Sequence, residues 1–437
     1  MLNRRDFSRV VAAMGAAAVL PSGVSGEEPA SRGKKWYRGN LHMHTFRSDG
    51  VAFAEEAAAL YKRLGYHFVC LTDHNSVHES DDRWVKLGQK KLTEAHVARY
   101  RETFDFPLEE REENGEKAYR LKTFAEMGAL LNEPDRFLLL SGMEYSGTVK
   151  NRHEVHTNFI NVRQNHPWVA KETTAENIDW SLELYRSMAN EQTIYTMNHP
   201  LWRFYDIDPM DLVKRPEIRF FEVANVEARP LFHAPVEFWT HDKFWDIVNA
   251  FRARRGEPLL YGTATDDTHG YNMFYRKPDF VGYVMVHAAE LSEGGLISAM
   301  KAGDFYASTG LTLNTMAFDR ATGTLSVEVA PEPGYAYTIQ FIGTKRDFDP
   351  TVLREVEHQA QGVMPSWWKG GELPKRKLAV YSDSIGQVLG EVRGTVGSYT
   401  LRPDDLYVRA KIFTQKISYN EWEHPSSPIA WTQPYSR

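Results

Sequence analysis

Cysteine is almost absent from this chain of 437 residues, which contains a single copy, Cys70. An internal disulfide is therefore impossible. Cys70 lies in the apolar run Phe68–Leu71. A free cysteine in such surroundings usually behaves as a small apolar residue, so we expect a buried core thiol rather than a nucleophile.

Long runs of basic residues are also missing. The formal net charge is −6, and no stretch of lysine and arginine is long enough to form a basic stripe. Because nucleic-acid binding depends on neutralising phosphates with such residues, we expect no nucleic-acid partner. The chain also lacks a glycine-rich phosphate loop and a dinucleotide-binding fingerprint.

Long apolar segments are lacking beyond the N-terminus. There Arg4-Arg5-Asp6-Phe7 precedes the apolar stretch Val10–Leu20, and Pro21-Ser22-Gly23 follows. This order is typical of a signal peptide, which we assign to residues 1–28. The paired arginines resemble a twin-arginine signal, with an ordinary Sec signal as the alternative. The stretch is too short for a membrane span, so we expect an exported protein, periplasmic or extracellular.

Apolar strands alternate with helical patterns over residues 36–309, which predicts an α/β domain with a parallel sheet and outer helices. The long charged segment 78–133 is predicted to be a mostly helical insertion that shapes access to a site. The expected strands are 39–43, 68–72, 137–140, 158–162, 194–197, 220–224, 259–262 and 281–286. The expected helices are 54–64, 93–103, 121–131, 181–190, 238–254 and 294–302.

The pattern changes after Thr309. Stretches such as 325–329, 337–341 and 406–412 alternate apolar and polar residues with a period of two, which indicates strands with one buried face. We therefore predict a small antiparallel β-sandwich over residues 310–437. Fourteen of the 16 histidines lie between His42 and His287, so we expect the chemistry in the first domain.

The first chemical motif is Leu41-His42-Met43-His44-Thr45, followed by Ser48-Asp49-Gly50. In a strand, residues i and i+2 point to one face, so His42 and His44 would present two imidazoles together. Paired imidazoles suit zinc, iron or manganese. Two histidines satisfied within a sheet are an equally good interpretation of this motif alone.

Further ionisable residues follow the ends of apolar strands. Parallel sheets place active sites at that edge, whereas a single such residue is often only a helix cap. Because the pattern recurs along the chain, it favours a metal site. His156 precedes a strand instead, with His153 as its competitor. The residues at strand ends are Asp73, His74, Glu144, His199, Asp267 and His269.

This ordered series resembles the PHP (polymerase and histidinol phosphatase) family. The matching pieces are Leu-His-x-His-Thr-x-x-Ser-Asp-Gly at 41–50, Leu-Thr-Asp-His-Asn at 71–75, Gly-Met-Glu at 142–144, His156, Asn-His-Pro at 198–200, Glu-Val-x-Asn at 222–225 and Asp-x-His at 267–269. The two-domain layout and the ending at 430–434 look like the exported branch that includes carbaryl-hydrolase-like (CehA/McbA-like) metallohydrolases.

The resemblance implies a distorted (β/α)7 barrel with two or three divalent metal ions, which would be zinc, manganese or iron. Carried over residue by residue, His42, His44, Glu144 and Asp267 would hold the first ion. Glu144 would bridge to a second, held also by His156 and His199. Asp49, His74 and His269 would hold a third. Asp73 is expected to orient a histidine rather than to bind metal.

The mechanistic hypothesis is hydrolysis by a hydroxide that bridges two metals, with His42, His44, Glu144 and Asp267 as the catalytic core. A phosphomonoester or phosphodiester is the favoured substrate, a small anionic molecule. Carbamate or ester hydrolysis on the same fold is the alternative, and a non-catalytic exported binding protein is a third reading. Arg152, Arg203 and Arg229 lie near the motifs and could clamp an anion, although a solvated surface arginine is the favoured interpretation of each.

Overall fold

The computed structural model describes residues 33–79, 82–149, 154–166, 169–202, 206–226, 239–271, 282–359, 375–415, 418–419 and 425–437. The proposed signal peptide lies outside these residues, and so do His153, Arg152, Arg203 and Arg229. Within the described part of the chain, no helix has the length and apolar character that crossing a membrane requires.

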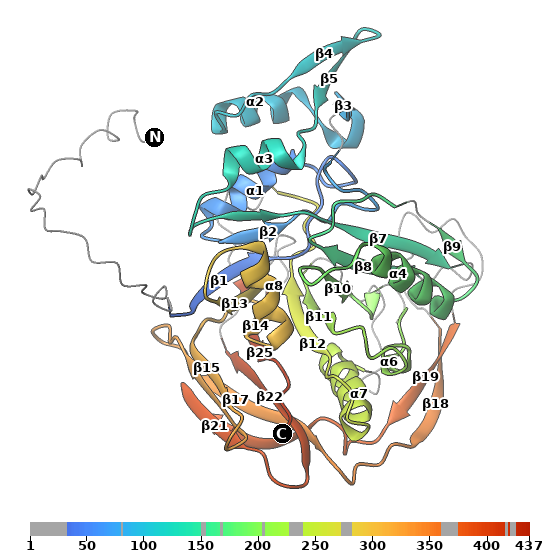
Figure 1. Ribbon diagram of the computed structural model, residues 1–437, viewed down its shortest axis with the longest axis vertical. Coiled ribbons are helices and arrows are strands. Elements are labelled where there is room, and N and C mark those ends of the chain that lie inside the picture. Colours follow the sequence, from blue (N-terminus) through green and yellow to red (C-terminus); the bar gives the residue numbers. More distant parts are fainter. Residues whose placement is uncertain are drawn as a thin grey trace, which may run out of the picture. The chain divides into compact units, whose positions relative to one another are not determined.

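The first sheet joins strands from the start and the end of the chain, in the order β20-β17-β22-β25-β14-β13-β1-β2-β6 (Figure 1). β1, β2 and β6 pair in parallel, and the other neighbouring pairs are antiparallel. The strands are β1 (Lys35–Asn40), β2 (Phe68–Cys70), β6 (Leu138–Leu140), β13 (Tyr283–Ala288), β14 (Phe305–Ser308), β17 (Tyr337–Lys345), β20 (Gln387–Arg393), β22 (Asp405–Thr414) and β25 (Ile429–Thr432).

The second sheet has the order β12-β11-β10-β8-β7-β9. β10, β11 and β12 are parallel, whereas β8 runs antiparallel to both β7 and β10. The strands are β7 (Gly142–Val149), β8 (Glu154–Ile160), β9 (Ala170–Lys171), β10 (Ile194–Met197), β11 (Phe220–Asn225) and β12 (Tyr261–Thr265).

The short parallel strands are buried on both faces, which explains why they are continuous apolar runs rather than alternating ones. Cys70 in β2 is fully buried, so the expectation of a core thiol is confirmed. The ring of Phe68 lies across Gly39, where a Cβ atom would come within 2.1 Å of it. A glycine is therefore required for β1 and β2 to pair at this point.

Most helices begin where a side chain caps them, and the capped starts of α3, α4 and α7 differ most from the expected positions. Thr123 and Thr173 accept the amide hydrogen bonds of Glu126 and Glu176, so α3 and α4 start just after these threonines. The helices are α1 (Ala54–Arg63), α2 (Glu94–Thr103), α3 (Phe124–Leu131), α4 (Thr174–Met188), α6 (Pro209–Val213), α7 (His241–Arg254) and α8 (Glu293–Ala302).

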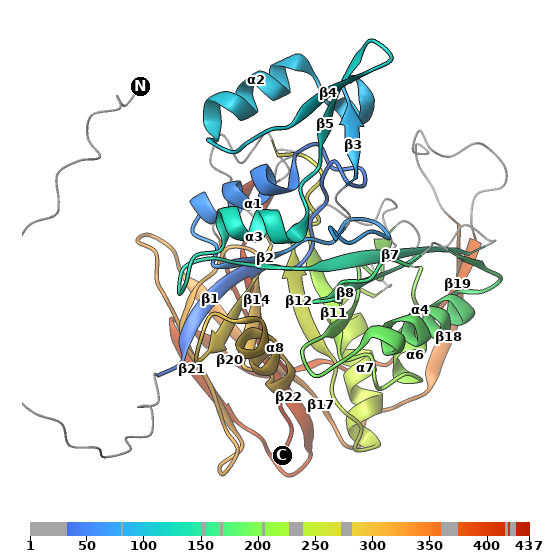
Figure 2. The same ribbon diagram turned by 45° about the horizontal axis from the view of Figure 1, so that its top comes forward.

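The segment 78–133 is not mostly helical, which corrects the prediction. It contains a sheet of three strands, β3 (Trp84–Lys86), β4 (Glu110–Glu113) and β5 (Glu116–Arg120), beside the short helix η1 (Gln89–Lys91) and α2. Asn114 and Gly115 both have positive φ and form the tight turn of the β4–β5 hairpin. Figures 1 and 2 show these strands and α2 on the side of α1 and α3 that faces away from the sheets.

The strands after Thr309 are antiparallel, as expected. Most of their buried apolar residues form one core, whereas Leu378, Tyr381 and Tyr407 pack into the core around α7. Their pairing continues across residue 309, because β14 pairs with β25. Beyond the first sheet, the strands are β15 (Leu313–Asp319), β16 (Thr324–Val329), β21 (Val396–Thr400), β18 (Val352–Gln359), β19 (Lys375–Tyr381), β23 (Ser418–Tyr419) and β24 (Pro425–Ser426). The side chain of His358 and all of His424 lie outside the described residues.

A buried ion cluster joins this C-terminal region to α7. The guanidinium of Arg409 in β22 is fully buried and donates to Asp246 at 2.9 and 2.6 Å, and it lies 3.0 Å from Asp242. Tyr407 donates a further hydrogen bond to Asp246 at 2.9 Å. The two halves of the chain therefore share buried charges that are satisfied only when both are folded together.

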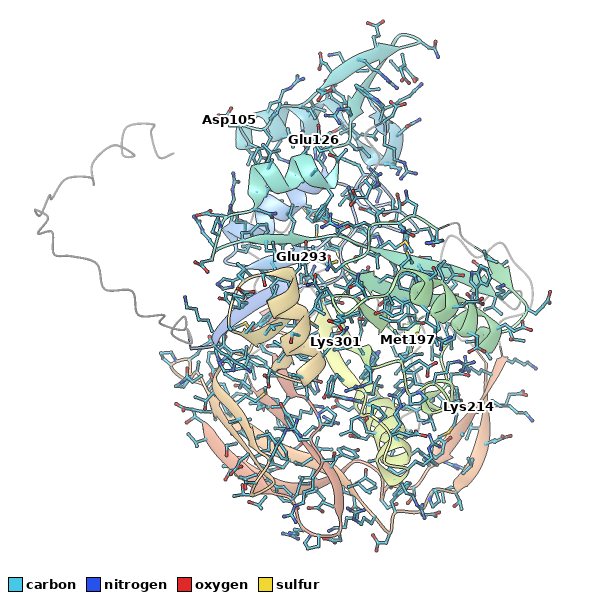
Figure 3. The ribbon with its side chains drawn as sticks, viewed as in Figure 1. Asp105, Glu126, Met197, Lys214, Glu293 and Lys301 are labelled. Atoms are coloured by element: carbon cyan, nitrogen blue, oxygen red, sulfur yellow. The ribbon has the colours of Figure 1, made fainter. Side chains whose placement is uncertain are left out.

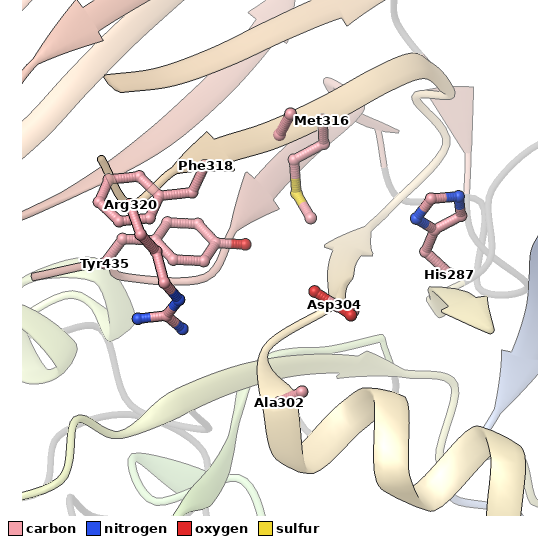
Figure 4. A pocket seen from close by; sticks show the side chains of 8 residues that line it. His287, Ala302, Asp304, Met316, Phe318, Arg320 and Tyr435 are labelled. Atoms are coloured by element: carbon pink, nitrogen blue, oxygen red, sulfur yellow. The ribbon is translucent and has the colours of Figure 1, made fainter. Parts of the chain in front are cut away.

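A small pocket lies between the end of α8 and β15, far in sequence from the predicted ligands (Figure 4). Asp304 and Arg320 line it, together with the stacked rings of Phe318 and Tyr435. Asp304 is already paired with Lys34. None of the predicted metal ligands lines this pocket.

The prediction of a mixed α/β fold is confirmed. β10 has the expected bounds, and most other strands and helices differ by a few residues. Met197, the last residue of β10, is buried in the interior two positions before His199 (Figure 3).

Candidate metal centre

His42 and His44 follow the end of β1 and are fully buried. Their segment crosses to the end of β12, where the His44 amide donates to the carbonyl of Thr268 at 2.9 Å and the Asp267 amide donates to that of His42 at 3.0 Å. This pairing brings Asp267 against both imidazoles. Its Oδ1 lies 3.1 Å from His42 Nε2 and 3.0 Å from His44 Nε2.

The spacing of these atoms has the size of a metal coordination shell. His42 Nε2 and His44 Nε2 are 3.2 Å apart, and Glu144 oxygens lie 3.3 and 3.4 Å from them. Ligand atoms about 2.0–2.1 Å from one ion at tetrahedral angles stand roughly 3.3 Å from one another. His42, His44 and Asp267 therefore converge as ligands of a single ion would, and the Glu144 carboxylate lies against both histidines through its two oxygens.

Glu144 is the hub of the cluster. It lies within β7 rather than in a loop after the preceding strand, which corrects the expected location. Its Oε1 is 3.2 Å from His156 Nδ1 and 3.4 Å from His199 Nε2. Its Oε2 is 2.8 Å from His74 Nδ1. One buried carboxylate thus faces five histidines, the position expected of a bridging ligand.

The outer end of the cluster holds Asp49, His74 and His269, with His44 behind them. Asp49 lies 3.6 Å from both His44 Nδ1 and His74 Nε2, and 3.4 Å from His269 Nε2. The Asp49 side chain is 56% exposed, whereas His44 is buried. This end of the cluster therefore opens toward solvent, where a small molecule can approach. The structure brings all nine predicted ligands together.

The buried carboxylates of the cluster favour a bound cation. Burial alone would raise the pKa of Glu144, yet the surrounding histidines hold it well below its ordinary value. Burial opposes protonation of His74, but the Glu144 carboxylate raises its pKa to about 10. Glu144 Oε2 and Asp267 Oδ1 are buried, and their nearest polar neighbours are the imidazole nitrogens of His74, His42 and His44 at 2.8–3.1 Å, which are donors only when protonated. Such oxygens are costly unless a cation or donor meets them, so the donor set fits divalent metal ions.

The backbone at the cluster is held in unusual conformations. Asn75 and Asp267 have φ values of 50° and 53°, in the left-handed region that residues other than glycine rarely adopt. Both residues are adjacent to or part of the predicted ligand set. Strained conformations of this kind concentrate at functional sites.

Glu222 is the main site residue whose role the sequence reasoning missed. It is fully buried and accepts hydrogen bonds from His42 Nδ1 at 2.7 Å, Thr265 Oγ1 at 2.6 Å and the His199 amide at 2.8 Å. Because the carboxylate requires a proton on Nδ1, Nε2 of His42 keeps its lone pair free to bind a metal. The Glu-Val-x-Asn piece at 222–225 was the available signal.

Asp73 was expected to orient a ligand histidine, and the contacts show a different role. It accepts hydrogen bonds from the amides of Thr45 and Ser48 at 2.8 and 3.0 Å. His78 Nε2 lies 2.7 Å from its other oxygen. Asp73 therefore shapes the loop between His44 and Asp49, and its histidine partner is not among the predicted ligands.

The 78–133 segment touches the same loop from outside. Lys90 donates to the carbonyls of Phe46 and Arg47 at 2.8 and 3.1 Å, and Arg83 donates to the Arg47 carbonyl at 3.4 Å and to Ser76 at 2.9 Å. Burial, together with the neighbouring charge of Arg83, lowers the pKa of Arg47 to about 10. The segment thus places cations beside the exposed end of the cluster.

Comparisons with known proteins find only weak structural similarities. No family model matches the chain, and no curated protein matches it. Among solved structures, a two-domain protein from Bacteroides vulgatus containing a predicted PHP-like metal-dependent phosphoesterase is 13% identical over 96% of this chain and 99% of its own, with a TM-score of 0.40. An amidohydrolase from Chromobacterium violaceum is 14% identical over 54% of this chain and 88% of its own, with a TM-score of 0.27. Because these identities and TM-scores are low, the assignment of a metal site depends on the geometry of this chain.

Proposed function

We propose that this chain is an exported metal-dependent phosphoesterase of the PHP type that binds two or three divalent cations. The observation that carries the proposal is the convergence of His42, His44, Glu144 and Asp267 at coordination distances, with two buried carboxylate oxygens left for a cation. Export rests on the twin-arginine pattern at Arg4-Arg5-Asp6-Phe7.

The ligands divide among the ions as follows. His42, His44, Glu144 and Asp267 would hold the first ion, and Glu144, His156 and His199 would hold the second. Asp49, His74 and His269 would hold the third. His44 and His74 each contact two of these groups, so the sites are close enough to act on one substrate. Zinc, manganese and iron all suit imidazole nitrogens mixed with carboxylate oxygens.

Divalent cations bound there would act as Lewis acids and neutralise charge on the oxygens of a phosphoryl group. The chain's own residues provide the rest of the arrangement. Glu222 keeps His42 in one tautomer, Asp73 holds the loop that carries Asp49, and the burial of the inner ligands excludes bulk water. Fixed ligand geometry of this kind lowers the reorganisation needed during reaction.

We also propose that the two sheets close into the (β/α)7 barrel. The support lies in backbone hydrogen bonds at the ligand end of the strands. Asn75 donates to the carbonyl of Glu144 at 2.8 Å, linking the end of β2 to β7, and the His44–Thr268 bond links the end of β1 to that of β12. The order β1-β2-β7-β8-β10-β11-β12 then returns to its start.

Carbamate or ester hydrolysis is the second candidate, and one feature favours it. The indole of Trp202 lies 4.8 Å from the His199 ring and 5.4 Å from the His156 ring. An aromatic wall beside the ligands suits a neutral aryl substrate, whereas a substrate with several negative charges gains more from three cations.

The deciding experiment measures metal content and turnover on the same purified preparation. We expect at least two metal equivalents and hydrolysis of 4-nitrophenyl phosphate or its bis-aryl diester. Glu144→Ala should lose at least one equivalent and most activity, while Glu183→Ala, a change at an exposed position on α4, should retain both. Full metal content and normal turnover in Glu144→Ala would contradict the metal assignment. An aryl carbamate preferred a hundredfold over both phosphates, ~2.7 kcal/mol in transition-state energy, would instead establish the second candidate.

A further inference from the structure

Three cations gather beside the exposed end of the metal cluster, and none of them forms an ion pair with a residue that the structure describes. Arg47 belongs to the ligand loop between His44 and Asp49, while Arg83 and Lys90 come from the 78–133 segment. Their contacts are hydrogen bonds to neutral groups: Arg47 Nε to Ser76 Oγ at 3.1 Å, Arg83 to Ser76 Oγ and the Arg47 carbonyl, and Lys90 to the carbonyls of Phe46 and Arg47. We call Arg47, Arg83 and Lys90 the cation trio.

Arg47 is the buried member of the trio. The residue is 3% exposed, and its Nη1 is buried without a hydrogen-bond partner among the described residues. Arg83 and Lys90 are exposed, and both donate to the backbone carbonyl of Arg47. A buried guanidinium nitrogen that donates to nothing is costly. The cost is recovered when an anion binds at the trio and draws Nη1 into a charged hydrogen bond.

The trio is placed to act on the same molecule as the metal cluster. Arg47 is two residues before Asp49, whose carboxylate lies 3.4 Å from His269 and 3.6 Å from His74. The Lys90 ammonium binds the carbonyls of Phe46 and Arg47 in the same loop, with the carboxylates of Asp73 and Asp49 as its nearby opposite charges. Lys90 also has φ 48° and ψ 34°, a left-handed conformation that aims its side chain at the ligand loop at some cost in backbone energy.

We propose that the cation trio binds a second anionic group of the substrate, a carboxylate or a phosphate, while the group to be hydrolysed lies at the metal cluster. This proposal rests on the phosphoesterase function proposed above and narrows its substrates to phosphate esters with two anionic groups. Guanidinium pairs recognise carboxylate and phosphate oxygens through parallel hydrogen bonds, which gives geometric selectivity as well as attraction.

The test compares two phosphate esters that differ in one anionic group, 3-phosphoglycerate and glycerol 3-phosphate. Binding to the metal-loaded full-length protein is measured by calorimetry, or by kcat/KM where the ligand is hydrolysed. We expect the wild-type protein to prefer 3-phosphoglycerate about tenfold, the value of one charged hydrogen bond. Arg83→Gln and Lys90→Gln should each lose most of that preference. Lys117→Gln, an exposed change on β5 of the same segment, should keep it.

Metal content is measured in every variant, because Arg83 and Lys90 also contact the ligand loop. Unchanged metal content with a lost preference supports the trio as an anion subsite. Loss of metal in Arg83→Gln or Lys90→Gln would overturn it and show that these residues only hold the loop. Equal affinity of the two esters for the wild-type protein would also overturn it. Absence of hydrolysis with the binding preference intact would instead contradict the phosphoesterase function and leave the subsite standing.

Discussion

Glu222→Gln is the most informative single change, because it keeps the shape of a buried side chain and alters only its hydrogen bonding. The wild-type carboxylate accepts from four donors: His42 Nδ1, Thr265 Oγ1, the His199 amide and Asn225 Nδ2. An amide side chain has a nitrogen that cannot accept. Wherever that nitrogen points, at least one of these partners loses its acceptor or must change its own protonation.

The tautomer of His42 decides the magnitude. If the new amide nitrogen faces His42, it donates to Nδ1, and the ring proton moves to Nε2, the atom that faces Asp267 and His44. A protonated Nε2 cannot bind metal. If the nitrogen faces the His199 amide instead, a buried donor is left unpaired at about 1–3 kcal/mol. Changes to groups that orient metal-binding histidines cost about 10- to 100-fold in metal affinity, or roughly 1.4–2.7 kcal/mol.

The assay is competition for metal with a chelator of known affinity, read by elemental analysis of the protein after equilibration. We expect Glu222→Gln to bind at least one equivalent about 10- to 100-fold more weakly than the wild type. Glu217→Gln is the matched control, since Glu217 precedes the same strand but pairs with Arg186 at the surface. Wild-type metal affinity in Glu222→Gln would refute the role of this carboxylate in selecting the His42 tautomer.

Three further outcomes follow from the structure. Arg409→Met should lower the free energy of unfolding by about 3–5 kcal/mol, because Asp246 loses its buried counter-charge, whereas Asp242 keeps Lys411; urea denaturation checks this, with the exposed Arg393→Met expected to be near neutral. A chain ended after Thr309 should be insoluble or unfolded by circular dichroism, since β14 loses β25; a soluble, folded product would contradict this. Metal affinity should rise with pH by about tenfold per unit for each proton released, because ligand histidines must be neutral; a flat profile in chelator competition would argue against histidine ligands.

Much of the fold follows from local patterns in the sequence. The apolar run 194–197 is long enough and buried enough to predict β10 at its actual bounds, and the helix α1 is predicted to within one residue. The apolar pattern does not reveal a strand boundary where the break between two strands is short. Only Ser141 separates β6 from β7, which lie in different sheets, and a Cβ on Gly142, the first residue of β7, would meet Cys70 Sγ and the Phe159 carbonyl at 2.7 Å. That crowding involves strands distant in sequence, so it cannot be seen locally.

The segment 78–133 shows the limit of charge and composition as signals. Its high content of charged residues is typical of an exposed helix. The Asn114-Gly115 turn is the local signal that indicates a hairpin instead. β5 carries a weak strand signal, because its two buried residues, Ala118 and Tyr119, are adjacent and do not alternate with exposed ones. Helix propensity outweighs such a weak strand pattern unless the tertiary contacts are known.

The nine predicted metal ligands are easier to predict from the sequence than the residues that position them. The nine ligand positions stand in recognisable motifs, since metal ligands need particular residue types at strand ends. Glu222, Asp73 and the cation trio support that site through contacts between segments far apart in the chain, such as Lys90 with Phe46. Asp73 and Glu222 stand in the motifs at 71–75 and 222–225, but their partners, like those of the cation trio, cannot be identified from spacing.

The backbone hydrogen bonds that join the two sheets are made by the metal ligands and their immediate neighbours. Metal binding should therefore be coupled to folding. The segments that carry His42 and His44 bond to the segment of Asp267 and Thr268, and Asn75, next to His74, bonds to Glu144. Each junction joins strands of different sheets. Without a cation, the facing carboxylates and imidazoles at these junctions must share protons among buried groups, which burial disfavours. A bound cation removes that conflict at the point where the sheets meet, so it should stabilise the contact between them as well as the active site.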